Sequence, residues 1–469
     1  MRQTAERQVS FADAELQRQV RLDTTLQGIS DLLDQQAQLV EMVHQDLVRG
    51  LKNPQAGRKG IGAEQALRCF VLKGMKNWDL RELAERTADG YSLRIFTNFF
   101  ARPVPKHDAF NRCFNRLTPQ TLRAINEVVV QAAVGVGVED GKKLRVDTTV
   151  VETDIHFPTD SSLLWDCVRV ISRLAERLID KLPAGTASFP DHTRQVRRRM
   201  QQIQRMTPKQ RPQRHVPTYR KLIKLTRRVV DNARHLIQKA RGTCGDGPID
   251  TILIEALGVQ IEHYCGLAER VIHQAHRRVV EDEPVGNEEK IFSIFEPHTD
   301  LIKRGKVQKP VEFGHKVFLA ESRIGLITDY RVLEGNPPDE RHVAPSLEHH
   351  KKTFGAAPEL YAADRGFYSP ANVEACRAAK VALECFPQRG GRKTPEREAH
   401  ERSRAFRNGQ RFRAGVEGRI SVLLRGRGMR RCPLEGAERF EVFVGAAVLA
   451  NNLMVIAEQL KRTAARRRR

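Results

Sequence analysis

The stretch that most constrains the fold is residues 144–152, LRVDTTVVE, where apolar and β-branched residues surround one carboxylate. Its composition and its near period-two pattern predict a buried β-strand. In that strand Leu144 and Val146 lie on one face, and Arg145 and Asp147 lie on the other. A buried carboxylate is costly unless a cation, a donor or a metal meets it. Asp147 is therefore either hydrogen-bonded to a neighbouring loop or part of a functional site.

The charge of the chain indicates a polyanionic partner. Its 469 residues include 80 Lys and Arg against 57 Asp and Glu, which gives a net charge of +23. Such an excess favours nucleic acid over an anionic membrane. The sequence has no run of about eighteen apolar residues, so we expect no membrane partner. We expect a cytoplasmic protein associated with the nucleoid.

The cysteines indicate which kind of metal site the chain could hold. There are eight of them, scattered, and no two form a C-x-x-C pair. This pattern argues against a zinc ribbon or a disulfide framework and for a reducing compartment. Any bound metal should therefore have oxygen ligands.

Residues 1–140 are predicted to form an all-α domain. Residues 63–73 have helical spacing, and residues 80–87 form a second short helix with Asp79 as a plausible N-cap. Two helices separated by a tight break permit a helix-turn-helix, although three-helix packing gives the same pattern. We interpret this domain as a DNA-binding domain, mainly because the chain is so basic.

A basic helical segment follows the strand. Residues 141–160 are predicted to be the first part of an α/β core, and residues 161–289 an α-helical insertion. Arg197, Arg198 and Lys221 lie in basic stretches of this insertion. They are candidate DNA contacts, and the alternative is a solvated helix face.

Strand patterns resume in residues 290–469, which we predict to be the remainder of the core. The expected elements are a strand, a hairpin, a short strand that ends at Asp364, a helix, a fifth strand and a last helix. A basic, glycine-rich linker is expected before that last helix. The segments are 290–295, 311–321 with 325–333, 358–367, 381–386, the linker 388–411 and the helix 412–424.

Three acids could converge in such a sheet. Asp147 and Asp364 become neighbours if their strands pair in parallel. Glu417 shares a helix face with Arg413 and Ser421, so it could complete an oxygen-rich pocket. Mg²⁺ is a hard ion that takes one or two carboxylates and keeps water or phosphate oxygens in its other positions. Two such ions can activate the attacking oxygen and stabilise the leaving oxygen in an in-line displacement at phosphorus.

Three segments resemble the signature regions of DDE transposases of bacterial insertion sequences, of the ISNCY type. They are VDTTVVETDIHFPTD at 146–160, YAADRGFY at 361–368 and FRAGVEGRI at 412–420. The resemblance implies an α/β, ribonuclease-H-like mixed-sheet core interrupted by the insertion. It also implies two Mg²⁺ ions, with Mn²⁺ as a substitute, and Asp147, Asp364 and Glu417 as catalytic residues and metal ligands.

The resemblance further implies an activity and its partners. A transposase of this kind binds terminal inverted repeats, cleaves DNA and joins the ends to target DNA. Synapsis of two ends implies at least a homodimer on DNA. Two alternatives remain open: a metal-dependent nuclease of the same fold, and a non-catalytic DNA-binding derivative.

The region around the last acid departs from the family pattern. Many relatives carry Tyr-x2-Arg-x3-Glu-x6-Lys, and here Arg413 fits while Gln410 and Leu424 stand at the Tyr and Lys positions. Arg425, one residue along, could supply the missing cation to a DNA phosphate. Arg365, next to Asp364, could contact the scissile phosphate or neutralise the acidic pocket. The competitors for the role of Glu417 are Glu384, Glu398 and Glu401.

Overall fold

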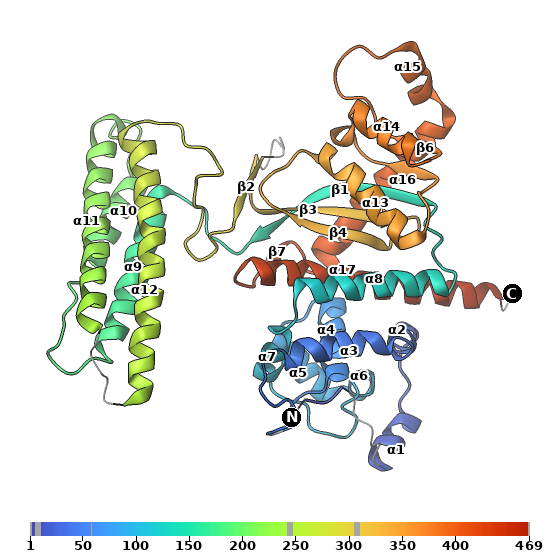
Figure 1. Ribbon diagram of the computed structural model, residues 1–469, viewed down its shortest axis with the longest axis horizontal. Coiled ribbons are helices and arrows are strands. Elements are labelled where there is room, and N and C mark those ends of the chain that lie inside the picture. The colour runs from blue at the N-terminus through green and yellow to red at the C-terminus, as the bar shows by residue number, and fades with distance from the viewer. Residues whose placement is uncertain (1, 5–10, 58, 242–246, 304–309, 468–469) are drawn as a thin grey trace. The chain divides into compact units, whose positions relative to one another are not determined.

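The computed structural model in Figure 1 describes residues 2–4, 11–57, 59–241, 247–303 and 310–467. The chain divides into two compact units. Unit 1 comprises Met1–Glu152 and His315–Arg469, and unit 2 comprises Thr153–Gly314. The N-terminal helices and the α/β core thus belong to one unit, and the inserted unit is longer at both ends than residues 161–289.

The described strands form one mixed sheet, in which β2 and the first residues of β3 belong to unit 2 and the other strands to unit 1. The strand order is β2-β3-β1-β5-β6, with β4 paired to β3 and β7 paired to β1. β3 and β4 are the antiparallel hairpin that the sequence predicts, whereas β1 with β5 and β5 with β6 are parallel pairs. The strands are β1 (Lys143–Thr153), β2 (Asp300–Lys303), β3 (Val311–Ser322), β4 (Ile327–Leu333), β5 (Leu360–Ala362), β6 (Leu383–Cys385) and β7 (Arg431–Cys432).

Helices cover both faces of this sheet. Val146 of β1 packs into one apolar cluster with residues of α13 (Val343–Phe354) and α14 (Pro370–Ala378). Val151 packs into another cluster with residues of α17 (Ala437–Arg467). The alternation of apolar residues along β1 therefore supplies both faces, as expected for a strand buried within a sheet. Asp147 belongs to the same face as Val151.

The N-terminal segment is helical, as predicted. Asp79 caps α5, because its carboxylate accepts hydrogen bonds from the backbone N–H groups of Arg81 and Glu82, each at 2.8 Å. Asn77, with φ at 54°, ends the preceding helix in the left-handed conformation. The helices are α1 (Phe11–Gln19), α2 (Thr24–Asp34), α3 (Ala37–Val48), α4 (Ala63–Lys76), α5 (Leu80–Asp89), α6 (Tyr91–Phe96), α7 (His107–Phe114) and α8 (Pro119–Gly135).

Helix α17 is long and apolar enough to cross a membrane by length and composition alone, but most of it is buried within the fold. It packs against α8, α2 and α4, and Figure 1 shows it running beside α8. Its Asn452 is fully buried and bonds the backbone of Ile327 and the side chain of Asn126, all at 2.8 Å. The apolar character of α17 is thus explained by its place in the core.

The described residues of unit 2 are mainly helical. Four helices pack around an apolar core: α9 (Asp160–Ile179), α10 (Thr193–Gln204), α11 (Arg211–Ala240) and α12 (Pro248–Ala275). A short π-helix, η1 (His276–Val280), continues α12. In the same unit β2 pairs with the first residues of β3, from Lys303 with Val311 to Asp300 with Gly314.

Two sequence predictions are wrong. Residues 290–295 form no strand, because Ile291 and Ile294 are buried against the helices of unit 2 and the side chain of Gln274 takes the Ile291 N–H at 2.8 Å. The strand in this region is β2. Residues 388–411 are not a linker, because they contain α15 (Pro395–Arg402) and the start of α16 (Arg404–Ser421). Thr394 and Ser403 cap these helices inside the charged stretch.

Candidate active site

Parallel pairing of β1 and β5 brings two acids to the same edge of the sheet, which meets the condition stated for Asp147 and Asp364 in the sequence analysis. Arg145 is paired with Ala362, and Asp147 and Asp364 each lie two residues beyond that pair. The Asp147 side chain is 10% exposed and that of Asp364 is 38% exposed. The Asp364 carboxylate also accepts a hydrogen bond from the Gly366 N–H at 2.7 Å. One acid is thus buried in the sheet, and the other is half-open to solvent.

Arg413 of α16 bridges the three predicted acids. Its Nη2 atom lies 2.9 Å from Oδ2 of Asp147 and 3.7 Å from Oδ2 of Asp364. Its Nη1 atom lies 3.3 Å from Oε1 of Glu417, one helical turn further along α16. The Glu417 side chain is 71% exposed, so it lies at the open side of the cluster. Acids from a strand, a post-strand turn and a helix therefore meet around one guanidinium.

Gln410 fastens α16 to the sheet beside this cluster. Its side-chain amide donates hydrogen bonds to the carbonyl oxygens of Cys385 at 2.6 Å and Ala363 at 3.2 Å. Gly409 permits the close approach, because a Cβ there would lie 2.2 Å from the Cys385 sulfur. Burial raises the pKa of that thiol to about 12, so it acts as a neutral packing group. The sequence marks Gln410 only as the residue at the Tyr position of the family pattern, and it carries no signal of these contacts with the sheet.

A buried ion network fixes the other side of α16. Glu321 of β3 is fully buried and accepts two hydrogen bonds of 2.7 Å from Arg145 and one of 3.1 Å from Arg419 of α16. Arg145 also donates to the Phe412 carbonyl at 2.7 Å and lies over the Phe412 ring. A Cβ at Gly415 would lie 2.2 Å from Nη1 of Arg145, so this mid-helix glycine lets the arginine pass. The network sets the position of the helix that carries Arg413 and Glu417.

Asp339 is a fourth acid near the site, which the sequence analysis missed. Its Oδ1 atom accepts a hydrogen bond from Thr148 at 3.0 Å and lies 2.8 Å from Nζ of Lys316. A Cβ at Gly366 would meet Asp339 Oδ2 at 3.1 Å and Asp364 Oδ1 at 3.0 Å. The absence of a side chain at Gly366 thus leaves room for both carboxylates. Asp339 lies in a turn-rich segment that carries no signal of such a role.

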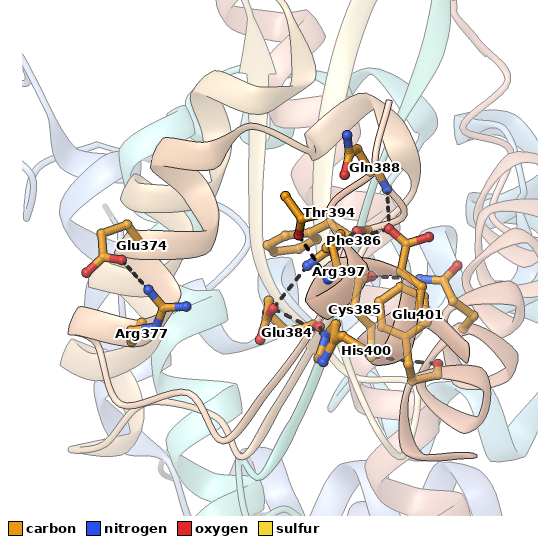
Figure 2. Close-up of polar contacts among 12 residues, drawn as sticks. Glu374, Arg377, Glu384, Cys385, Phe386, Gln388, Thr394, Arg397, His400 and Glu401 are labelled. Carbon is orange, nitrogen blue, oxygen red and sulfur yellow. Dashed lines mark hydrogen bonds and ion pairs between the residues drawn. The ribbon is translucent and has the colours of Figure 1, made fainter. Parts of the chain in front are cut away.

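The competing glutamates have partners outside the acid cluster, and Figure 2 shows two of these glutamates, Glu384 and Glu401. Glu384 lies 3.3 Å from Arg397 and 3.3 Å from His400. Glu401 lies 3.0 Å from Arg397 and accepts a hydrogen bond from the Gln388 N–H at 2.9 Å. Glu384 therefore holds α15 against β6, and Glu401 connects α15 with the segment that follows β6. Glu398 is exposed and pairs with Arg402 on the same helix at 2.6 Å.

The predicted DNA contacts are more dispersed. Arg365 is exposed in the short turn after Asp364, and Arg425 is exposed in the π-helix η4 (Val422–Gly426) that continues α16. The other three are exposed on unit 2 and belong to its helices: Arg197 and Arg198 on α10, and Lys221 on α11. Of the predicted cations, Arg413 is in direct contact with the acids.

The donor set suits a hard divalent ion, but Arg413 now lies where such an ion would be needed. Carboxylate oxygens on rigid elements are the ligands that Mg²⁺ prefers. Among the residues that the structure describes, no three His, Cys, Asp or Glu side chains are close enough together to hold a metal ion. The carboxylates of the three acids contact different atoms of the Arg413 guanidinium and do not converge on one position where a metal ion could lie. Arg413 would have to withdraw for them to share an ion.

The N-terminal helices match a known family. Residues 14–116, from within α1 to the end of α7, match the family described as Transposase domain (DUF772). The chain contains a transposase domain. This domain implies a transposase that binds DNA, in agreement with the net charge of +23. No curated protein and no solved structure matches the chain.

Proposed function

We propose that the chain is an insertion-sequence transposase of the DDE type, which binds terminal inverted repeats, cleaves DNA and transfers the cut strands to target DNA. The observation that carries the proposal is the meeting of Asp147, Asp364 and Glu417 around Arg413 in a chain with a transposase domain. A mixed sheet interrupted after β1 by a helical unit supports a ribonuclease-H-like core. The protein would act in the cytoplasm on nucleoid DNA, as at least a homodimer.

In the proposed mechanism the three acids would hold two Mg²⁺ ions, with Mn²⁺ as a substitute. When bound, such ions activate the attacking oxygen and stabilise the leaving oxygen at phosphorus. Asp147 lies in β1, Asp364 lies in the turn after β5, and Glu417 lies on α16. Arg413, once released from the acids, would bind a phosphate oxygen through its planar fork of donors. Arg365 and Arg425 would bind phosphates of the DNA strand on either side of the cleaved bond.

Arg413 also gives a prediction about the metal-free protein. Arg413→Gln removes the shared counter-ion of three carboxylates, so their mutual repulsion should lower the stability of the metal-free protein by about 1–3 kcal/mol. Mg²⁺ should then raise the melting temperature more in the variant than in the native protein, because the ion relieves that repulsion. Differential scanning fluorimetry with and without Mg²⁺ measures both effects.

The control for this experiment is Arg402→Gln. Arg402 forms an exposed one-turn pair with Glu398, with 79% of its side chain accessible, so its loss should change little. An Arg413→Gln protein that responds to Mg²⁺ no more than this control would contradict the role of Arg413 as a substitute cation.

The function itself is tested with DNA from the flanks of the gene. Oligonucleotides that carry the terminal inverted repeats should be cut in Mg²⁺ to leave a 3′-hydroxyl, and pre-cleaved ends should be joined to a target plasmid. Cleavage without joining would favour the metal-dependent nuclease. Binding without either reaction would favour a non-catalytic DNA-binding derivative.

A further inference from the structure

A strongly basic groove lies on unit 2. None of its residues belongs to the candidate active site, whose residues are in unit 1. Arg220, Lys224, Arg227 and Arg228 of α11 line a groove of about 480 Å³, together with Asp231 and His276. Their spacing of four, three and one residues places the four cations on one face of the helix. His276 is the first residue of the π-helix η1, a kind of irregularity that is frequent at functional sites.

These four cations differ from other cations of the same unit. Within the described residues, none of the four forms an ion pair with a carboxylate, and Asp231 pairs with none of them. By contrast, Arg234 on the same helix lies 2.9 Å from Glu262 and 2.5 Å from Glu269. Some arginines of the unit are therefore ion-paired, whereas the four cations of the groove have no carboxylate within ion-pair distance in the described residues.

The uncompensated face is costly to the helix. Like charges one turn apart, as in Arg220 with Lys224 and Lys224 with Arg228, destabilise a helix by about 0.2–0.5 kcal/mol per pair. A carboxylate at any of these positions would remove that cost. A polyanion bound over the four cations would screen this repulsion.

We propose that this groove, which we call the α11 groove, binds the phosphate backbone of duplex DNA without reading its sequence. Arg220 to Arg228 span about 12 Å of helix, over which duplex DNA carries about seven phosphate charges. The groove is a second DNA contact, besides the transposase domain and the acid cluster. The choice of DNA as the ligand rests on the proposed function. Binding of DNA in the groove requires neither metal nor catalysis. The sequence suggested Arg197, Arg198 and Lys221 as the DNA contacts of unit 2. The proposal instead makes the α11 groove the main DNA contact of this unit, and Lys221 is next to Arg220 in the sequence.

The test is the salt dependence of DNA binding by Lys224→Gln/Arg228→Gln. The probe is a 40-base-pair duplex of arbitrary sequence in EDTA, measured by fluorescence anisotropy from low to moderate salt. Each lost phosphate contact lowers the slope of log affinity against log salt by about 0.9, so the pair should lower it by about 2. Affinity should fall about tenfold near 0.1 M salt. The melting temperature should stay the same or rise, because a like-charge pair is removed.

Two further variants make the result decisive. Lys351→Gln/Lys352→Gln removes the same charge from the exposed face of α13 and should leave the slope unchanged. Lys224→Arg/Arg228→Lys keeps both charges and should bind like the native protein. An unchanged slope in the neutralised groove, or an equal loss in the α13 control, would overturn the proposal. If neutralising the groove lowers the salt slope as expected but the native protein does not cleave element ends, the groove proposal is supported. That result would refute the catalytic proposal alone.

Discussion

Asp147→Asn and Glu417→Gln should each reduce the Mg²⁺-dependent cleavage of element ends about a thousandfold or more, on the order of 4 kcal/mol of transition-state stabilisation. The amides keep the shape of the side chains but lose the negative charge that a divalent ion requires. DNA affinity should stay the same or rise slightly, because negative charge near phosphate is removed. Cleavage of a labelled repeat-containing duplex and binding of the same duplex in EDTA give the two readouts.

The competing glutamates provide matched controls. Glu398→Gln alters an exposed pair on α15, and Glu384→Gln alters the attachment of α15 to β6. Neither acid contacts Arg413 in the described structure, so both variants should retain cleavage within about tenfold of the native rate. An inactive Glu398→Gln together with an active Glu417→Gln would show that the wrong glutamate has been chosen.

The second large effect concerns the buried ion network. Glu321→Ala leaves Arg145 and Arg419, whose side chains are 12% and 20% exposed, without their shared carboxylate. Breaking a buried ion pair from one side costs about 3–5 kcal/mol, because the remaining charge stays desolvated. The free energy of unfolding of unit 1 should fall by this amount. Since the network positions α16, cleavage should fall as well.

Tryptophan fluorescence can follow unit 1 by itself. The sequence has two tryptophans, Trp78 in unit 1 and Trp165 in unit 2. In a Trp165→Phe background, urea unfolding followed through Trp78 therefore reports on unit 1. The control is Glu374→Ala, which removes an exposed pair with Arg377 and should cost less than about 1 kcal/mol. Equal losses in the two variants would contradict the structural role of Glu321.

The sequence predicted several elements, among them the strand that carries Asp147, because each has a strong local pattern. The strand around Asp147 has β-branched residues, the hairpin β3–β4 has a tight turn, and Asp79 is an ordinary N-cap residue. Parallel pairing of β1 with β5 was a condition that the sequence left open, and the register of the two strands meets it by placing both acids at the same edge. The helical insertion followed from its charge and helical spacing.

The remaining features depend on tertiary contacts that leave no local pattern. Residues 290–295 have a strand-like composition, but they are buried against helices, and a side chain from α12 satisfies part of their backbone. Asp339 becomes part of the site through Thr148 and Lys316, which are distant in the sequence. Gln410 and Glu321 act on α16 through bonds to other elements, and propensity contains no information about such bonds.

The most direct test of the account is the position of Mn²⁺ in crystals of the protein bound to repeat DNA, located by anomalous scattering. The account predicts manganese between the carboxylates of Asp147, Asp364 and Glu417, with the Arg413 guanidinium moved from these acids to a DNA phosphate. Manganese bound elsewhere, with Arg413 still bridging the three acids at saturating Mn²⁺, would contradict it.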